Sequence, residues 1–369
     1  MTTQAPKKIL LTGATGYIGG SILTTLLNST VPSLKEAPIS LLLRGKDRAD
    51  TFTAKYGDRV KPILYEGMDD LDRTIEVAAQ HDIVINTTMG DHPGSSAALV
   101  KGLAQRKKLT NSEPWIIHTS GTSNVSDRPI TNPMPIREWD DSKDDVYSFE
   151  KELEAKEPYG QRTSELAVID TGLELGVKTL VIMSPVIYGI GTGLYKKIGA
   201  SIFFLRGIVS AGSGLVVGKG DGVWNHVHIE DVADLYVLIL RKLVENGGTG
   251  VPTGKKGIIF SANGDHSRLE QTKDAVEGAS KHGLISDTTI SHIDLDEGTE
   301  IFSPSLGITN VRDTMDTARS FVETAFVSNA RTVATVARNL GWKPSKGEDA
   351  WKQHDSEDAE VMKKEEQKE

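Results

Sequence analysis

The segment LLTGATGYIGGSIL, from Leu10 to Leu23, is the most informative part of this sequence about its fold. It follows an apolar run, opens a helical pattern, and contains four glycines, at Gly13, Gly16, Gly19 and Gly20. In a strand–loop–helix unit of this kind, glycines permit a tight turn, close approach of a pyrophosphate and close packing of the helix on the strand. The N-terminus of the helix then offers free N–H groups to the phosphates. The context therefore predicts a dinucleotide site in this loop.

The first half of the chain alternates between apolar, β-branched runs and longer helical patterns. We expect strands at Lys8–Leu11, Ile39–Leu43, Val60–Leu64, Ile83–Asn86, Trp115–His118 and Thr179–Met183. We expect helices between them at Gly16–Asn28, Leu71–Gln80, Ser95–Arg106 and Tyr159–Leu175. This alternation predicts an α/β fold with a Rossmann-type, doubly wound parallel sheet over residues 1–190. A late strand at residues 257–261 is expected to return to that sheet.

The pattern changes after Pro185, where glycine-rich segments and helices replace the regular alternation. Residues 191–345 are therefore expected to form mainly a smaller, C-terminal substrate-binding domain, with a late helix at Thr324–Leu340. The final segment, residues 346–369, carries nine acidic and five basic residues. Because so polar a segment has few apolar groups to bury, we expect it to be a mobile tail.

Composition excludes several classes of function. The chain of 369 residues has no cysteine, which excludes disulfides, thiolate metal sites and cysteine nucleophiles. Its formal charge of −9 offers no basic surface for nucleic acid. The N-terminal residues MTTQAPKK contain no apolar segment, and the longest uninterrupted apolar run, Leu235–Leu240, is too short to cross a membrane. We therefore expect a cytoplasmic protein with no membrane partner.

The end of the second expected strand distinguishes between two cofactors. NAD-binding proteins favour an acidic residue there, whereas an arginine suits the 2′-phosphate of NADP. The sequence reads ISLLLRGKDR, with Arg44 at the strand end and the first acid, Asp47, three residues later. This favours NADP(H) over NAD(H).

The spacing Gly-x-x-Gly-x-x-Gly, with motifs in matching order along the chain, resembles the extended branch of the short-chain dehydrogenase/reductase superfamily, which includes the NAD-dependent epimerase/dehydratase-like family. The matching segments are EGMDDLD, VINTTMG, WIIHTSGTSNV, SPVIYGIGTG and WNHVHIEDVADLYVLIL, and they cover about residues 7 to 265. The resemblance implies that the cofactor is held by Thr12, Gly13, Gly16, Tyr17, Ile18, Gly19, Asp69, Thr87, Thr88, Pro185 and Val186. Because relatives often pair through helices near the family tyrosine, it also allows a homodimer.

The resemblance further implies a Tyr-x-x-x-Lys pair in which tyrosine is the general acid/base and lysine lowers its pKa. Two tyrosines compete for this role. Tyr147 has the literal motif, with Lys151, but lies in an acidic insert; Tyr159 precedes Pro185 by the gap-free spacing expected of the family, and we assign the role to it. The lysine position is then Thr163, which carries no charge, so that Lys151, Arg162 or no residue takes its place.

A hydroxyl partner for the substrate carbonyl is expected in HTSGTSNV, where Thr122 is favoured over Ser120. His226 and His228 suggest a metal site, but no third ligand is evident, so we expect no metal. The leading hypothesis is an NADP(H)-dependent oxidoreductase that reduces a carbonyl or similar unsaturated group of a small metabolite. The alternatives are a nucleotide-sugar epimerase or dehydratase, and a non-catalytic NADP-binding sensor or regulatory protein.

Overall fold

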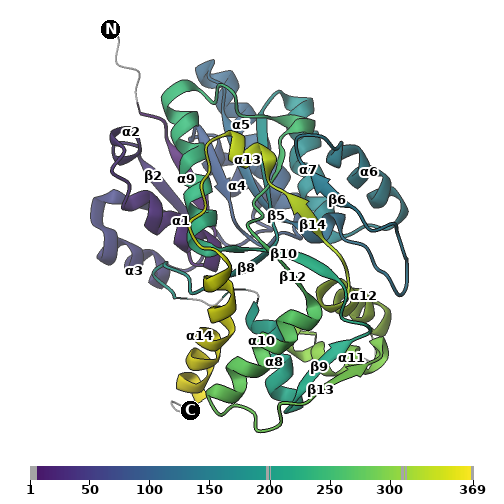
Figure 1. Cartoon of the computed structure of the whole chain (residues 1–369). Helices are drawn as coiled ribbons and strands as arrows, with labels where there is room; N and C mark the ends of the chain where they lie inside the picture. Colours follow the sequence, from purple (N-terminus) through teal and green to yellow (C-terminus); the bar gives the residue numbers. More distant parts are fainter. Residues whose placement is uncertain (1–5, 197–198, 200, 309–310, 312–313, 367–369) are drawn as a thin grey trace.

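Within residues 6–196, 199, 201–308, 311 and 314–366, which the computed structural model describes, seven parallel strands form the central sheet (Figure 1). Their order across the sheet is β11-β7-β5-β4-β1-β2-β3. The strands are β1 (Ile9–Thr12), β2 (Ile39–Leu43), β3 (Lys61–Leu64), β4 (Ile83–Asn86), β5 (Trp115–Gly121), β7 (Lys178–Ser184) and β11 (Ile258–Phe260). The order reverses between β1 and β4, and ligands of such sheets bind at the carboxyl ends of the strands beside this point. The predicted doubly wound α/β sheet is confirmed.

Helices cover both faces of the sheet, because its central strands are apolar on both sides. Ile9 and Leu11 of β1 pack in one core with α1 (Tyr17–Leu27) and α9 (Ile229–Asn246). Leu10, between them, packs in the opposite core with α4 (Leu71–Ala78), α5 (Pro93–Thr110) and α7 (Gly160–Leu175). The remaining elements of this part are α2 (Pro32–Lys35), α3 (Lys46–Tyr56), α6 (Val146–Lys156) and the 3₁₀ turns η1 (Gly57–Arg59), η2 (Thr122–Val125) and η3 (Gly254–Lys256).

A second, smaller region lies below the carboxyl ends of the sheet strands (Figure 1). It has its own hydrophobic core, which includes Leu205, Phe302 and Phe326. Its elements are α8 (Ser201–Ala211), β9 (Gly214–Val217), α10 (Arg268–Lys281), β13 (Ile290–Ile293), α11 (Leu295–Phe302), η4 (Pro304–Leu306) and α12 (Met315–Phe326). β9 and β13 pair in parallel.

Two small sheets tie the regions together. β10 (Val223–His228) lies between β8 (Val186–Tyr188), to which it is parallel, and β12 (Asp265–Ser267), to which it is antiparallel. β6 (Glu138–Asp140) pairs in parallel with β14 (Arg331–Val333), and a short helix, α13 (Thr335–Asn339), follows. The prediction of a helix over Thr324–Leu340 is therefore wrong. The side chain of Asn329 bonds to Asp127, and Trp224 donates to Ser328, so that the chain turns at this point and enters the small sheet.

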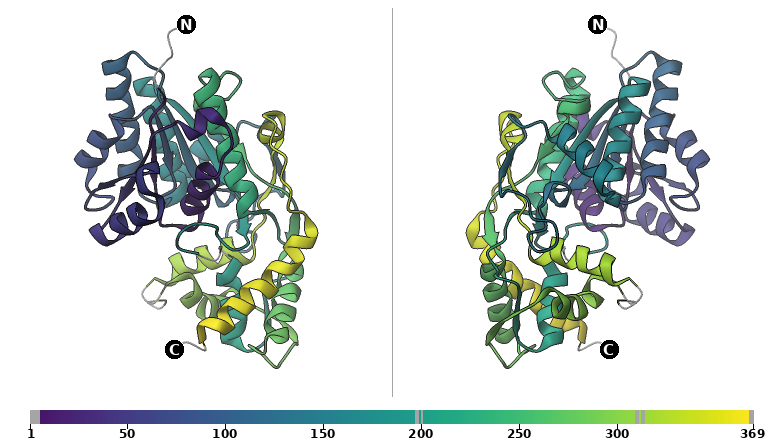
Figure 2. Two further views of the ribbon diagram at one scale, coloured as in Figure 1. Left: turned by 90° about the vertical axis from the view of Figure 1, so that its left-hand side faces the viewer. Right: turned by 90° about the vertical axis from the view of Figure 1, so that its right-hand side faces the viewer.

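The C-terminal segment corrects a further expectation. Its polar composition predicts a mobile tail, whereas the segment forms α14 (Glu348–Glu366), which packs against α10 and α8 (Figure 2). Trp351 is 2% exposed, and its ring stacks on those of His226, His266 and His354 at centroid distances of 4.1 to 4.3 Å. The segment packs because its few large or uncharged side chains share one face, and buried imidazoles from β10 and β12 meet them there. Every helix in the described ranges is too short or too polar to span a membrane.

Candidate active site

The glycine loop is pressed against the end of β4. Gly13 has φ +73°, and a Cβ atom there would lie 2.4 Å from the carbonyl oxygen of Thr87. A Cβ atom at Gly19 would lie 2.3 Å from Thr87 Oγ1, which donates a hydrogen bond to the carbonyl oxygen of Thr12 at 2.7 Å. Glycine is therefore required at both positions, and Thr87 fixes the loop. Thr12 is itself buried, with its hydroxyl on Asn86 at 2.8 Å.

The first turn of α1 is open to an anion. Gly16 caps the helix without a side-chain hydrogen bond, and the first turn contains no acidic residue. Its N–H groups therefore have no partner inside the helix and can donate hydrogen bonds to phosphate oxygens. Tyr17 and Ile18, which open this turn, line the cavity described below. The close backbone approach and the free N–H groups fit the pyrophosphate of a dinucleotide, so that the predicted loop residues suit that group.

Arg44 directly follows β2 and is exposed, and among the described residues it forms no ion pair. Its guanidinium is therefore free to bind an anion at the carboxyl end of the sheet. Asp69 lies after β3 with a fully exposed side chain, and its carboxylate bonds to His92 Nε2 at 3.1 Å. Both predicted residues therefore lie on loops at the end of the sheet where the glycine loop is found.

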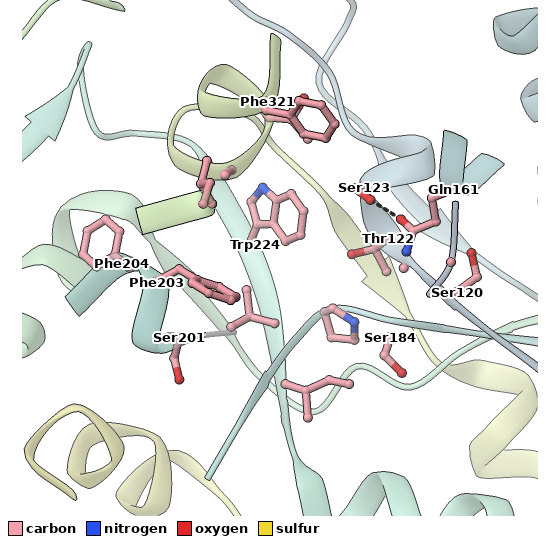
Figure 3. A pocket seen from close by; sticks show the side chains of 18 of the residues that line it. Ser120, Thr122, Ser123, Gln161, Ser184, Ser201, Phe203, Phe204, Trp224 and Phe321 are labelled. Atoms are coloured by element: carbon pink, nitrogen blue, oxygen red, sulfur yellow. Dashed lines mark hydrogen bonds between the residues drawn. The ribbon is translucent and has the colours of Figure 1, made fainter. Parts of the chain in front are cut away.

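A cavity of about 550 Å³ joins this loop to the smaller region (Figure 3). One end carries several hydroxyl groups and is lined by predicted cofactor residues together with the end of β5 and the start of η2: Tyr17, Ile18, Thr87, Thr88, Ser120, Thr122, Pro185 and Val186. The other end is aromatic, with Phe203, Phe204, Trp224, Phe321 and Phe326. The cavity therefore joins an end that carries several hydroxyl groups, beside the glycine loop, to an aromatic end.

Tyr159 lies on the wall between the two ends, where it directly precedes α7. Its hydroxyl donates to Ser123 Oγ at 3.2 Å, and Ser123 donates in turn to Gln161 Oε1 at 2.6 Å (Figure 3). Burial raises the pKa of Tyr159, and the bond to Ser123 and the charge of Arg162 only partly oppose that effect. The phenol is therefore protonated at neutral pH and acts as a hydrogen-bond donor.

The two hydroxyls expected to assist Tyr159 lie nearby but do not contact it. Thr122 is fully buried, and its Oγ1 has no hydrogen-bond partner in the described structure. Ser120 Oγ accepts a bond from Asn124 Nδ2 at 3.1 Å, and the same amide donates to Glu165 at 2.7 Å. Among the described residues, the hydroxyl that meets Tyr159 is Ser123, which the sequence analysis did not single out.

A buried pair of carboxyl groups lies behind Ser120. Glu150 of α6 and Glu165 of α7 are both fully buried. Burial raises the pKa of Glu165 to about 7, and burial together with the neighbouring Glu165 raises that of Glu150 well above its usual range. The pair therefore holds at least one proton at neutral pH.

The competing tyrosine faces another partner. Tyr147 donates to Asp170 Oδ1 at 2.6 Å, and Lys151 forms an ion pair with Asp170 Oδ2 at 3.0 Å. Burial, followed by the bond to Asp170, raises the pKa of Tyr147 to about 12. Neither Tyr147 nor Lys151 lines the cavity. Of the two candidates, the structure brings Tyr159 to the cavity.

Thr163, an uncharged residue, occupies the position of the family lysine. Thr163 Oγ1 donates to Glu154 Oε1 and to the backbone carbonyl of Tyr159. Arg162 is buried and pairs with the same Glu154 at 3.0 Å, while its Cζ lies 5.8 Å from the centre of the Tyr159 ring. Arg162 thus lies beside the phenol ring, and Lys151 lies elsewhere.

His226 and His228, which the sequence analysis considered as metal ligands and set aside, make other contacts. His226 stacks on Trp351, and His228 accepts a hydrogen bond from the backbone N–H of Glu230 at the start of α9. In the described residues, no group of three or more histidine, aspartate or glutamate side chains is arranged to hold a metal ion.

Sequence reasoning missed Ser123, Gln161 and the aromatic end of the cavity. Ser123 stands one residue from the favoured Thr122, and Gln161 lies in the quoted tyrosine segment, so that both were within reach of the same motifs. The aromatic residues come from β10, α8 and α12, and no short pattern in the sequence connects them.

Comparison with known proteins gives three kinds of similarity. Residues 138–251 match the NAD dependent epimerase/dehydratase family. The oxidase ucsJ of Acremonium sp. is 31% identical over 304 residues, which cover 80% of this chain and 85% of that protein. Among solved structures, UDP-glucuronic acid 4-epimerase from Bacillus cereus, with UDP-glucuronic acid and NAD, superposes with a TM-score of 0.58 at 12% identity, covering 96% of this chain and 99% of that one. The dTDP-glucose 4,6-dehydratase DesIV from Streptomyces venezuelae, with NAD bound, gives 0.59 at 14% identity, covering 94% and 95%.

Proposed function

This chain belongs to the NAD-dependent epimerase/dehydratase family of extended short-chain dehydrogenases/reductases, and from that membership we propose that it is an NADP(H)-dependent oxidoreductase that reduces a carbonyl or similar unsaturated group of a small molecule. The observation that carries the proposal is that Tyr159 and the first turn of α1 line one cavity, whose far end is aromatic. A nicotinamide dinucleotide, when bound, supplies the hydride. The similarity to a protein named as an oxidase supports a redox reaction.

The state of Tyr159 supports reduction as the direction. Because burial raises its pKa, the phenol holds its proton at neutral pH and is ready to give it to an oxygen that gains negative charge. Ser123, bonded in turn to Gln161, fixes the position of the phenolic oxygen. Thr122, the hydroxyl residue favoured in the sequence, also lines the cavity, with its Oγ1 buried and without a partner in the described structure.

The choice of NADP(H) rests on Arg44. An exposed arginine after β2, without an ion-pair partner in the part of the chain described, suits a 2′-phosphate. The relatives from Bacillus cereus and Streptomyces venezuelae were crystallised with NAD, which supports NAD(H) as the competing cofactor. The two are separated by titration calorimetry with NADPH and NADH.

We expect NADPH to bind more tightly by about one to two decades, because a charge-assisted hydrogen bond contributes about 1.5–3 kcal/mol. The Arg44→Asp variant should reverse the preference, and Arg59→Asp, an exposed arginine before β3, is the matched control. Equal affinity of the unmutated protein for both dinucleotides would refute the NADP(H) assignment. Turnover is then tested by the loss of NADPH absorbance with a panel of aromatic aldehydes and ketones.

A non-catalytic sensor is the second candidate, and one specific observation favours it. Thr163 stands where family members carry lysine, and no lysine is found among the described residues that line the cavity. If the protein binds NADPH tightly but oxidises none of it with any carbonyl compound of the panel, the sensor function is favoured over the oxidoreductase function. A nucleotide-sugar epimerase or dehydratase is disfavoured because the far end of the cavity is aromatic, whereas a sugar diphosphate is polar and charged.

A further inference from the structure

The cavity contains a buried cation that has no acidic partner. Arg268, the first residue of α10, is 3% exposed and lines the cavity wall. One nitrogen of its guanidinium donates to Gln271 Oε1 at 2.9 Å, and the guanidinium carbon lies 4.8 Å from the centre of the Trp224 ring. Its Nε has no hydrogen-bond partner, and none of the described carboxylates pairs with it.

Such a group is unusual in a protein interior. Burying a charge is strongly unfavourable unless an opposite charge accompanies it, and buried charges are in general paired. The lack of an acidic neighbour is reflected in the pKa of Arg268, which burial lowers to about 9. The titratable side chain beside it, His266, is held neutral by burial, so it supplies no negative charge. The guanidinium is therefore available to an anionic ligand in the cavity.

The surroundings of Arg268 limit what that ligand is. Trp224 and Phe204 are 7% and 5% exposed, while Phe203 and Phe321, which line the same cavity, are 39% and 44% exposed. Figure 3 shows Trp224 between the Phe203 and Phe321 rings. Aromatic walls of this kind favour flat, apolar ligands.

We propose that Arg268 binds the anionic group of the substrate, and that the substrate is a flat, apolar acid whose carboxylate meets the guanidinium while its ring system lies among the aromatic side chains. Guanidinium and carboxylate are complementary in shape and form paired hydrogen bonds. The inference rests on the proposed function in placing a substrate in this end of the cavity, but it concerns binding and not hydride transfer.

The same chemistry has a second source, because the phosphates of a dinucleotide are also anionic. Trp224 and the phenylalanines around Arg268 favour the carboxylate, since a pyrophosphate is polar along its whole length, and the open first turn of α1 already suits it. The two sources are separated by measuring dinucleotide affinity and acid affinity in the same variants.

The test uses the full chain and two probes of equal shape, 2-naphthoate and its neutral amide, 2-naphthamide. Binding is measured by titration calorimetry with and without saturating NADPH, at millimolar probe. We expect the unmutated protein to bind the acid about ten- to a hundredfold more tightly than the amide, because a hydrogen bond to a charged group is stronger than a neutral one. Equal binding of both probes, or binding of neither, would overturn the proposal without the use of any variant.

Variants then identify the residue. Arg268→Met should bring the acid down to the affinity of the amide, and Arg268→Lys should retain part of the preference, since it keeps the charge but loses the planar geometry. Arg206→Met, an exposed arginine on α8, is the matched control and should change nothing. If Arg268→Met weakens NADPH and leaves the naphthoate preference intact, the guanidinium serves the dinucleotide and the proposal is wrong. If the acid preference holds while no carbonyl compound is reduced, the oxidoreductase proposal fails and the anion site stands.

Discussion

The phenolic oxygen of Tyr159 and the hydroxyl oxygen of Ser123 lie 3.2 Å apart, and the Ser123 hydroxyl donates a hydrogen bond to Gln161 Oε1. Tyr159 is thereby oriented by neutral groups, where family members use an ammonium. Burial raises the pKa of Tyr159, and the bond to Ser123 and the charge of Arg162 only partly oppose that effect, so that the protonated form is the one the site maintains. The tyrosine is consequently suited to giving a proton and poorly suited to accepting one.

Replacing Tyr159 by phenylalanine should depress turnover by roughly two decades or more, because a positioned acid contributes about 10²–10⁴ to rate. Dinucleotide affinity should change little, since only one hydroxyl is lost. The matched control is Tyr147→Phe, whose hydroxyl meets Asp170 away from the cavity, and it should keep normal turnover. Steady-state rates and calorimetric affinities of both variants decide the matter. If Tyr147→Phe loses turnover and Tyr159→Phe retains it, the assignment of the acid to Tyr159 is wrong.

Replacing Gly19 by alanine should abolish dinucleotide binding, although alanine is normally the better helix residue. The added Cβ would lie 2.3 Å from Thr87 Oγ1 and 2.5 Å from the carbonyl oxygen of Gly13, so that the loop must move away from β4. Gly347→Ala serves as control, because nothing lies within 4 Å of its added Cβ. Fluorescence titration with NADPH measures the effect. An affinity within a factor of two of the unmutated protein would show that the loop tolerates a side chain.

Replacing Trp351 by alanine should lower the free energy of unfolding by about 3–5 kcal/mol, as expected for a large buried aromatic residue. The ring stacks on three histidines, and α14 is held besides by the bond from Ser201 to Asp358 at 2.9 Å. Lys352→Ala, an exposed neighbour on the same helix, should be nearly silent. Urea unfolding of both variants provides the comparison. Equal stability of the two variants would show that Trp351 does not anchor α14 and that this helix is a loose tail.

The histidines around Trp351 predict a loss of stability in acid. Burial lowers the pKa of His226 to about 3 and that of His266 well below its usual range, and their Nδ1 atoms lie 3.2 Å apart, where two protons do not fit. Each becomes protonated on unfolding once the pH falls below about 6.5, the value for a free histidine. Since the unfolded chain then binds more protons, each histidine removes up to about 1.4 kcal/mol of stability per pH unit.

Carboxyl groups facing this cluster act in the opposite sense. Burial raises the pKa of Asp358 to about 6 and that of Asp355 well above its usual range, so their contribution to stability is lost as the pH rises through those values. Glu348, 3.5 Å from His226, and the nearby Asp274, Glu357, Lys352 and Arg268 complete the charged surroundings. His226→Gln isolates one histidine and should flatten the fall in stability between pH 6.5 and 4, relative to the exposed control His292→Gln. Parallel curves for the two variants would show that His226 takes no part.

Most of the fold could be predicted from the sequence, since its strongest signals are local. Strands such as Ile39–Leu43 are continuous apolar runs bounded by polar residues, and the glycine spacing identifies the turn after β1. The tail could not be predicted in this way. Trp351, His354, Asp358 and Ala359 share one helix face, but histidine and aspartate are usually exposed, and their burial depends on partners that lie far away in the chain.

The candidate site was partly accessible for the same reason. The spacing between Tyr159 and Pro185 selected the tyrosine that lines the cavity, because an uninterrupted helix and strand fix that distance. The hydroxyl partner differed by one residue, because the short 3₁₀ turn η2 after β5 decides which side chain faces Tyr159. Arg268 gave no sequence signal, since its meaning comes from the absence of an acidic neighbour, which only the packed structure reveals.

The way in which the chain builds the smaller region has a consequence for engineering by recombination. Strands β8 and β10 come from before α9, α10 and α12 come from after it, and α14 comes from the end of the described chain, while β14 returns to pair with β6. No single crossover point in the gene would therefore exchange the ligand-binding half of this protein for that of a relative. A chimera with one junction between β10 and α14 would join Trp224 of one parent to the Trp351 position, or to both the Arg268 and Trp351 positions, of the other, and these residues would have to be reselected together.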